Sequence, residues 1–190
     1  MKYLGIDSVD LHLKGGIHTA REIEQQPELW GKIYKQIDSE QHSIQSFLNE
    51  ILPKTKRILI AGAGTSAFIG LSLRGVFQRN FNIATEAIST TDLVSHPKDY
   101  FHADISTLMI SFARSGNSPE SVAAIALADE LCGTCHHLII TCNAEGTLAK
   151  YSSKAVKYII TLPPESNDQS LAMTSSYSGM LLTGHRVFVH

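Results

Sequence analysis

The sequence predicts a three-layer α/β fold with a doubly wound, five-stranded parallel sheet in the flavodoxin-like order 2-1-3-4-5, preceded by N-terminal helices. Three observations support this fold class. Five short apolar runs alternate with helix-like stretches, which is typical of a parallel sheet covered on both faces. A long segment with helical periodicity precedes the first run. Loops rich in Gly, Ser and Thr follow the first and third runs, whose carboxyl ends diverge in this order and leave room for a ligand.

The composition limits the classes of protein that the chain can belong to. Its 190 residues are 43% hydrophobic, enough for one globular domain with a buried core. The 16 Lys and Arg nearly balance the 18 Asp and Glu, so we expect no general affinity for nucleic acid. No apolar stretch approaches the ~20 residues of a membrane span, and Asp7 and Asp10 argue against a secretory signal. Three cysteines cannot all pair within one chain, which favours a cytoplasmic location.

The N-terminal part of the chain is expected to be a loose arm followed by helices. Residues 1–17 form the arm. Thr19-Ala-Arg-Glu22 has the spacing of a capping box and predicts the start of a short helix. Pro27 suits the first turn of a longer helix, whose apolar residues recur mostly at helical spacing until Pro53 ends it.

Predicted strands and helices alternate through the rest of the chain. The strands are expected at 57–61, 82–88, 107–112, 137–141 and 156–162, and the pair Pro163-Pro164 ends the last one. The helices are expected from the first Gly-rich loop to about Arg79, and over 122–131, 147–151 and 171–182. Right-handed crossovers through these helices make the strands parallel.

Two loops at the predicted crevice have the composition of a phosphate site. Gly62-Ala-Gly64-Thr65-Ser66 follows the first strand, and Ser115-Gly116-Asn117-Ser118 follows the third, with Pro119 at a first helical position. Glycine permits close backbone approach, and a helix N-terminus offers unpaired N–H groups. Together with the hydroxyl groups, these features predict a pocket for a compact anion such as a single phosphate. The alternative is that the serines and the asparagine only cap helices.

A dinucleotide site is a second interpretation of the first loop. Gly62-Ala-Gly-Thr-Ser-Ala67 fits the pattern G-x-G-x-x-[GA], and Glu86 lies near the end of the second predicted strand, where a ribose-binding acid belongs. This interpretation is less favoured because it leaves the Ser-rich second loop unexplained.

A cluster of cysteine and histidine invites a redox or zinc interpretation. It comprises Cys132-Gly-Thr-Cys135, His136, His137 and Cys142. The pair falls at a predicted helix C-terminus, where the dipole disfavours thiolate, and the ligand spacing is not that of a structural zinc site. We therefore favour a turn with buried cysteines, and we predict neither a metal nor a cofactor.

Five blocks of the sequence, in order, resemble a known family. The two loops resemble the phosphosugar loops of the sugar isomerase (SIS) domain. The wider set resembles the branch of tagatose-6-phosphate ketose/aldose isomerases, also described as galactosamine-6-phosphate deaminases/isomerases. The blocks are Thr19–Pro27 (TAREIEQQP), Gly62–Gly70 (GAGTSAFIG), Thr90–Val94 (TTDLV), Ser111–Ala124 (SFARSGNSPESVAA) and Leu171–Ser176 (LAMTSS). The resemblance implies an SIS phosphosugar-binding domain over 54–190, preceded by an arm and helices over 1–53.

The resemblance also implies a set of binding residues. Arg114 would reach the phosphate or a sugar hydroxyl, and Thr174 and Ser175 would close the pocket. The rim would be lined by Thr90, Thr91 and Asp92. The implied phosphate- and substrate-binding residues are Gly64, Thr65, Ser66, Arg114, Ser115, Gly116, Asn117, Ser118, Thr174 and Ser175.

The implied parent activity is isomerisation or deamination of a hexose 6-phosphate of the tagatose/galactosamine series. Isomerisation needs a base that moves a proton between C1 and C2. In the family this base is typically a glutamate, and two-domain members carry it in or near a second SIS domain. Because the sequence from Thr183 onward departs from the family, we expect a truncated form with weak or no turnover. Glu120, in the first turn of a predicted helix, is interpreted as a partner of the helix dipole, so no catalytic residue is assigned.

Two other functions stay open. A single-domain isomerase of the phosphoheptose type would need Glu and His at a subunit boundary, for which Glu86, His96 and His102 are candidates. A non-catalytic phosphosugar sensor would pair the domain with a helix-turn-helix, but no basic recognition helix is visible. In each case we expect a phosphosugar as the small-molecule partner, no nucleic acid or membrane, and a homodimer or larger oligomer.

Overall fold

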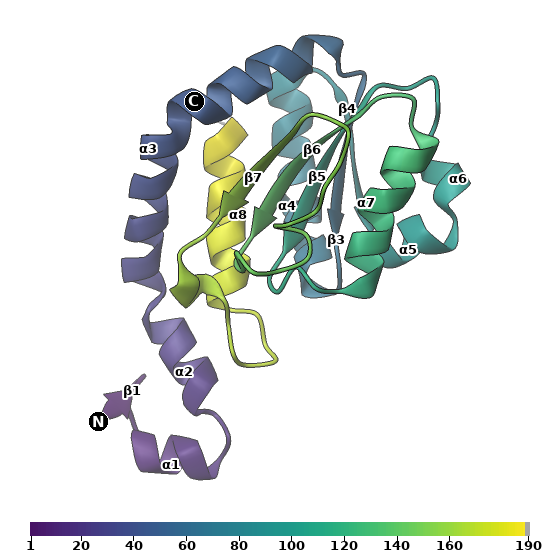
Figure 1. The fold of residues 1–190 in the computed structure, drawn as a ribbon. Coiled ribbons are helices and arrows are strands. Elements are labelled where there is room, and N and C mark those ends of the chain that lie inside the picture. The colour runs from purple at the N-terminus through teal and green to yellow at the C-terminus, as the bar shows by residue number, and fades with distance from the viewer. Residues whose placement is uncertain (189–190) are drawn as a thin grey trace.

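Five parallel strands form the centre of the protein in the computed structural model, which describes residues 1–188 (Figure 1). They pair in the order β4-β3-β5-β6-β7. Counted along the chain this is 2-1-3-4-5, so the predicted fold class and strand order are confirmed. The strands are β3 (Arg57–Gly62), β4 (Ala84–Ser89), β5 (Thr107–Ala113), β6 (Cys135–Thr141) and β7 (Lys157–Thr161).

Helices cover both faces of this sheet, and the side chains of the strands alternate between the two cores. Along β3, Ile58 and Ile60 pack with the long helices, whereas Leu59 and Ala61 pack on the opposite side. This alternation follows from the two-residue period of a strand. One face carries α3 (Gln26–Ile51), α4 (Thr65–Phe81) and α8 (Ser175–Phe188), and the other carries α5 (Thr90–Ser95) and α7 (Pro119–Leu131) (Figure 1).

The long N-terminal helix agrees with its prediction. Pro27 lies in the first turn of α3, where a missing N–H costs nothing, and the buried residues of this helix recur at helical spacing. Pro53 lies in a short 3₁₀ helix, η1 (Leu52–Lys54), that ends the segment before β3.

The N-terminal arm is not loose, and here the prediction was wrong. Two short antiparallel strands, β1 (Lys2–Tyr3) and β2 (Ile6–Asp7), are followed by α1 (Ser8–Leu13) and α2 (Ile17–Glu24). Asp7 caps α1 by accepting a hydrogen bond from the backbone N–H of Val9. The predicted capping box is absent, because α2 begins after Gly16, before Thr19, and the Glu22 side chain bonds elsewhere.

Four further segments differ from the prediction. Residues 147–150 form turns and not a helix; the N–H of Lys150 bonds to the carbonyl of Gly146 and that of Tyr151 to the carbonyl of Leu148. The last helix begins at Ser175 and not near residue 171. Helix α5 and the one-turn helix α6 (Pro97–Tyr100) follow β4, and a 3₁₀ turn, η2 (Pro164–Ser166), follows β7.

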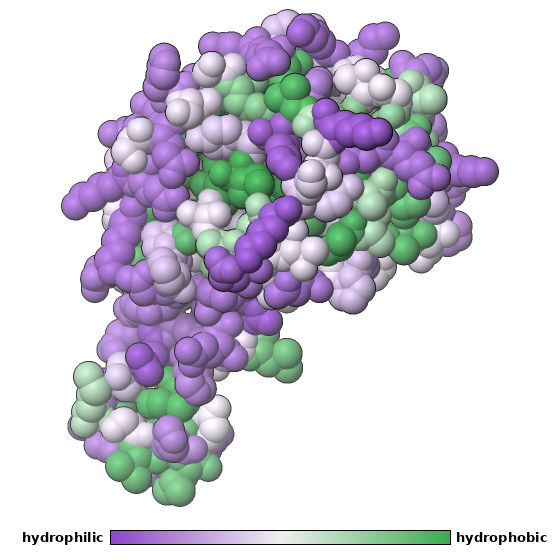
Figure 2. All heavy atoms as spheres, viewed as in Figure 1, coloured by the Kyte–Doolittle hydropathy of each residue, from purple (hydrophilic) through white to green (hydrophobic). Residues whose placement is uncertain are grey.

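The surface is mainly hydrophilic, with hydrophobic residues gathered at the N-terminal end of the molecule, the lowest part in this view (Figure 2). Met1, Val9 and Leu13 are 85%, 65% and 82% exposed there. Within residues 1–188, no helix combines the length and the apolar character that crossing a membrane requires.

Candidate functional site

The two Gly- and Ser-rich loops leave the same edge of the sheet. Gly62, the last residue of β3, pairs with Phe112 of β5 on one side and with Ser89 of β4 on the other. Helix α4 then covers one face of the sheet and α7 the other, so the chain diverges between β3 and β5, as the strand order predicted. We call the residues 62–66, 114–118 and 168–175 the carboxyl-edge site.

The first loop is built by close packing of backbone. A Cβ on Gly62 would lie 2.5 Å from the carbonyl carbon of Ser66, so only glycine fits there. Gly64 has a φ of +53° and precedes the first residue of α4, Thr65, which is exposed. Ser66 is only 4% exposed, and its hydroxyl lies 3.8 Å from the sulfur of Met173. The loop thus presents the N-terminus of a 17-residue helix with two hydroxyl groups in its first turn.

The second loop is held by its neighbour along the sheet, the loop after β6. The Asn117 side chain accepts hydrogen bonds from the backbone N–H and the hydroxyl of Thr147, at 2.9 and 3.0 Å. The Asn143 amide donates to the Ser115 carbonyl at 2.9 Å. Gly116 has a φ of +65° and its carbonyl accepts from Leu148 N–H. These bonds fix the loop before any ligand binds.

Polar groups remain available where the second loop enters α7. The Ser118 carbonyl accepts from the N–H groups of Ser121 and Val122, but its hydroxyl makes no capping bond. The Ser115 hydroxyl accepts only from the N–H of Asn117, at 3.3 Å, in the described part of the chain. Pro119 and Glu120 lie in the first turn of α7, as predicted.

A third segment, the turn before α8, is organised by a buried carboxylate. Asp168 is 6% exposed and accepts hydrogen bonds from the backbone N–H groups of Thr174, Ser175 and Ser176 at 2.8 to 3.2 Å. It thereby caps the N-terminus of α8 from six to eight residues away in sequence. The Ser175 hydroxyl is fully buried and donates to the carbonyl of Glu22, so it supports the site from beneath and does not face a ligand.

Glu22 connects helix α2 to this turn and, through it, to Arg114. Its carboxylate accepts from the N–H of Gln169 at 2.6 Å and from the N–H and hydroxyl of Ser170. The carbonyl of Ser170 in turn accepts from Arg114 at 2.9 Å. Arg114 is therefore oriented through one of its five N–H donors, which leaves the others for an anion.

The predicted rim residues lie after β4, at the same edge. Thr90 is 2% exposed and is the first residue of α5, while Thr91 and Asp92 are exposed. Ser89 caps this helix by accepting from the N–H of Asp92 at 3.3 Å. Of the three, Thr90 is therefore enclosed by its neighbours, and only Thr91 and Asp92 are open to solvent at this edge.

Glu86 does not occupy the position that dinucleotide binding would require. It is the third residue of β4, not its end, and forms an ion pair with Arg57 at 3.0 Å. The prediction that it lies near the end of the strand was wrong, and its partner holds it away from the carboxyl edge. His96 lies between α5 and α6 and His102 follows α6, so neither belongs to the three segments that form the carboxyl-edge site.

The three cysteines are free and buried, as expected for the turn interpretation. Cys132 follows α7 and Cys135 begins β6, at the opposite end of the sheet from the carboxyl-edge site. Among residues 1–188, no three His, Cys, Asp or Glu side chains are grouped as a metal site would need.

Sequence reasoning missed the residues that brace the site. Glu22 and Asn143 act through hydrogen bonds to loops far along the chain, up to 148 residues away, and Asp168 acts on N–H groups six to eight residues further on. Asn143 alone carried a clue, because it follows the fourth strand at the same edge as the two loops.

Comparison with known proteins gives consistent results. The model of the family described as "SIS domain" matches residues 51–190. A D-galactosamine-6-phosphate deaminase AgaS from Shewanella sp. (strain ANA-3) is 49% identical over 179 residues, which are 92% of this chain and 46% of that protein. The chain therefore spans about half the length of the curated relatives it matches.

Comparison with solved structures likewise shows that this chain corresponds to about half of each related chain. Tagatose-6-phosphate ketose/aldose isomerase from Escherichia coli superposes with a TM-score of 0.86 at 38% identity, covering 93% of this chain and 48% of that one. A protein from Clostridium novyi NT, provisionally described with the same activity, superposes with a TM-score of 0.93 at 45% identity. The alignment covers 99% of this chain and 48% of the Clostridium protein.

Proposed function

The chain belongs to the SIS domain family, and on this premise we propose that its carboxyl-edge site binds the phosphate group of a hexose 6-phosphate. The observation that carries the proposal is the convergence of two hydroxyl-bearing helix N-termini, those of α4 and α7, at the divergence of β3 and β5. Unpaired N–H groups and the positive ends of two helix dipoles favour a compact dianion.

Each proposed contact has a defined origin. The phosphate would accept hydrogen bonds from Thr65 and Ser66 of the first loop and from Ser115 and Ser118 of the second. Arg114 would add a charge-assisted bond, because Ser170 already orients its guanidinium. Gly64 and Gly116 supply the positive φ angles that turn the loops, and Asn117 and Thr174 complete the walls. In this proposal residues 54–190 form the binding domain and residues 1–53 support it.

The sugar and the reaction follow from the relatives. Because they are named as a D-galactosamine-6-phosphate deaminase and a tagatose-6-phosphate ketose/aldose isomerase, we propose a galactosamine or tagatose 6-phosphate as the ligand. Both activities need a base that moves a proton at C2. Glu120, the one carboxylate of the second loop, lies in the first turn of α7 and is assigned to the helix dipole. The function proposed for this chain is therefore binding, with weak or no turnover by the chain alone.

We further propose that the protein acts in the cytoplasm and self-associates as a homodimer or a larger oligomer. An apolar groove of about 550 Å³ between α3, α4 and α8 supports association, and it is lined by Trp30, Leu73, Val76, Leu181 and Leu182. Apolar surfaces of this kind promote association. Light scattering over a concentration series tests this, and a monomer at every concentration would contradict it.

Calorimetric titration with galactosamine 6-phosphate, tagatose 6-phosphate and unphosphorylated galactosamine tests the binding proposal. We expect the two phosphorylated sugars to bind and the unphosphorylated one to bind at least about 100-fold more weakly, because it lacks the charge that the helix N-termini and Arg114 recognise. Equal affinity for all three would rule out phosphate recognition. An assay for ketose and ammonia on the same samples measures turnover.

A pair of variants on one helix locates the site. Ser66→Ala removes a hydroxyl of the carboxyl-edge site and should weaken binding about 10-fold, the effect of one hydrogen bond to a charged group. Ser72→Ala is the control, since Ser72 lies two turns further along α4, is exposed and bonds the carbonyl of Phe68. If both variants bind like the unmodified protein, the phosphate does not contact the first loop.

A further inference from the structure

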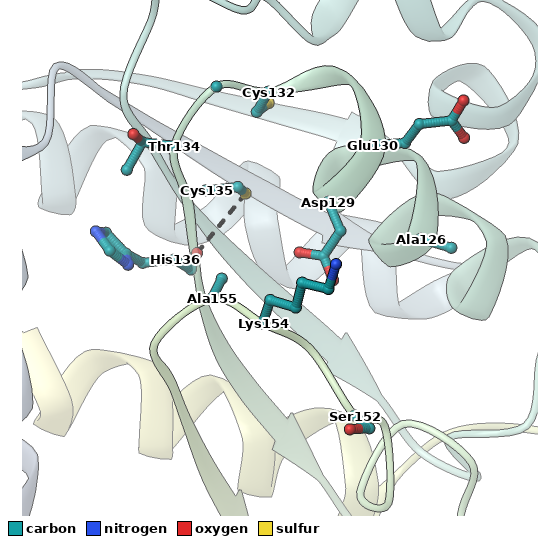
Figure 3. A pocket seen from close by; sticks show the side chains of 11 residues that line it. Ala126, Asp129, Glu130, Cys132, Thr134, Cys135, His136, Ser152, Lys154 and Ala155 are labelled. Atoms are coloured by element: carbon teal, nitrogen blue, oxygen red, sulfur yellow. Dashed lines mark hydrogen bonds between the residues drawn. The ribbon is translucent and has the colours of Figure 1, made fainter.

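A cavity of about 550 Å³ lies at the amino end of β6, away from the carboxyl-edge site (Figure 3). Two sulfur atoms face it from the segment that joins α7 to β6. Its chemistry-bearing lining residues are Asp129, Glu130, Cys132, Cys135, His136 and Lys154. The proposed phosphosugar function uses none of them.

The joining segment brings the two cysteines together. Cys132 caps α7, its N–H donating to the carbonyl of Ala128, and Cys135 is the first residue of β6. Gly133 between them is pressed against the carbonyl of Ala103, where a Cβ would not fit. The N–H of Thr107 donates to the carbonyl of Thr134 at 3.0 Å. The backbone is thereby held in a turn from which both cysteines line the cavity, and the Cys135 thiol donates a weak hydrogen bond to the carbonyl of His136 at 3.9 Å (Figure 3).

Charge and hydrogen bonding distinguish the two thiols. The pKa of Cys132 is lowered, first by the neighbouring Cys135 thiol, and despite burial, with help from a backbone N–H of His102, the Thr107 hydroxyl and the Arg57 guanidinium. The pKa of Cys135 is raised by the neighbouring Cys132 and by burial. Of the two thiols, Cys132 is therefore the one that ionises first and can act as the nucleophile.

Arg57 provides a second, independent observation at this place. Its side chain is 8% exposed, ion-paired to Glu86 through one nitrogen and bonded to the carbonyl of Tyr100 through another. Within residues 1–188 its Nε has no hydrogen-bond partner. A buried cation with an unused donor favours an anion nearby and acts against the unfavourable end of the α7 dipole.

We propose that Cys132 and Cys135 form a redox-active dithiol that a small organic disulfide, entering through the cavity, oxidises reversibly to an intrachain disulfide. The cavity admits such a molecule, and its lining has both signs of charge, from Lys154 on the one hand and from Asp129 and Glu130 on the other. Dithiols in reducing compartments are characteristically catalytic or redox-sensing.

The exchange proceeds in two balanced steps. The Cys132 thiolate attacks one sulfur of the small disulfide, a Cys132–sulfur bond forms, the original sulfur–sulfur bond breaks, and one small thiolate leaves and takes up a proton. Cys135 then loses its proton and attacks the sulfur of Cys132, releasing the second small thiol. The protein is oxidised by two electrons and the small disulfide is reduced to two thiols. Loss of the Cys132 negative charge in the first step removes the electrostatic resistance to ionisation of Cys135.

Intact-mass spectrometry of the native full chain with glutathione disulfide tests the proposal. We expect the unmodified protein to lose two hydrogens without gaining an adduct. Cys135→Ser should stop at a stable glutathione adduct on Cys132, and Cys132→Ser should react at least about 10-fold more slowly. Cys142→Ser is the control, because Cys142 is 2% exposed and burial raises its pKa to about 12. It should behave as the unmodified protein does.

Two outcomes would overturn the proposal. One is an unmodified native chain that stays fully reduced while the urea-unfolded chain is oxidised. The other is an adduct that maps to Cys142. Phenylarsine oxide, which bridges two neighbouring thiols, gives a measurement that requires no substitution. One equivalent should bind the native chain and block alkylation of Cys132 and Cys135 together, whereas no binding would show that the thiols are not adjacent.

Discussion

The loop after β3 and the loop after β5 have nearly the same composition, yet the structure holds them in different ways. The first, 62–66, is held by its own backbone, because Gly62 packs directly against Ser66. The second, 114–118, is held by side chains of another loop, those of Asn143 and Thr147. The comparison teaches that the first loop tolerates changes of side chain but not of backbone, while the second depends on a hydrogen-bond network.

The strongest test of this contrast is a pair of glycine substitutions. In Gly62→Ala the new methyl group lies 2.5 Å from a backbone carbon that cannot move without displacing α4, so we expect a loss of about 3 kcal/mol or more of unfolding free energy. In Gly116→Ala the nearest neighbour is 3.4 Å away and only the positive φ is strained, at about 1–2 kcal/mol. Urea denaturation measures both. Equal losses would show that the two loops are held alike.

A substitution in the turn before α8 should disturb both loops together. Asp168→Asn replaces an acceptor of several N–H groups by a side chain that presents its own N–H₂ to some of them, which should cost about 2–3 kcal/mol. Because this turn contacts Ser66 through Met173 and Arg114 through Ser170, binding of galactosamine 6-phosphate should also weaken.

Asp92→Asn is the matched control for that substitution. Asp92 is an exposed carboxylate in the first turn of α5, and its replacement should cost less than about 1 kcal/mol. Denaturation and calorimetry on both variants separate the roles. A stable Asp168→Asn protein would mean that α8 does not need this cap.

Much of the fold and the position of the site could be predicted from local patterns. The alternation of apolar runs with helical stretches determines the sheet, and the strand order places both loops at one edge. Even the long helix, with Pro27 in its first turn, follows from periodicity alone. These properties depend on residues near one another in sequence.

The hydrogen bonds by which Glu22 and Asn143 hold the loops of the site could not be predicted, because they join segments that are distant in the sequence. Thr19 to Glu22 has the pattern of a capping box, yet the Glu22 carboxylate binds Ser170, which no local pattern indicates. Residues 147–151 have helical character, yet 147–150 form turns beside the second loop, with Asn117 bonded to Thr147. In the case of Glu22 a long-range hydrogen bond replaces the local one.

Replacing single side chains should produce a smaller difference in stability between the two loops. Asn117→Ala loses two hydrogen bonds to Thr147 and should destabilise the chain by about 1 kcal/mol. Thr65→Ala should change stability by less than about 0.5 kcal/mol, because the exposed Thr65 makes no side-chain hydrogen bond within residues 1–188. Both should weaken phosphosugar binding. We therefore expect the two variants to bind the phosphosugar with similar affinity but to differ in unfolding free energy. Equal unfolding free energies would show that the bonds of Asn117 to Thr147 do not stabilise the second loop.

The smallest expected difference between the two loops is in their response to acid. Of the two helices that follow the loops, α7 carries an acid-sensitive pair of side chains and α4 does not. Asp129 of α7 lies 2.7 Å from the ring of His137, which is 1% exposed, whereas α4 contains no Asp, Glu or His. Burial lowers the pKa of His137 below 6.5, although Asp129 raises it in part. The pKa of Asp129 is lowered below 3.8, since hydrogen bonds from His137, Ser153 and Tyr151 outweigh its burial.

Both shifts have the same sign, since the unfolded chain takes up protons at a higher pH than the folded one. Stability should therefore fall as the pH drops below 6.5, and again below 3.8. Urea denaturation about one pH unit above and below 6.5 measures the first loss, which His137→Gln should remove and the exposed His96→Gln should leave unchanged. The protection factors of the backbone amides, which correct for the slower intrinsic exchange at lower pH, should fall in α7 more than in α4. Protection factors that fall equally in both helices would show that acid acts on the whole molecule and does not distinguish the two loops.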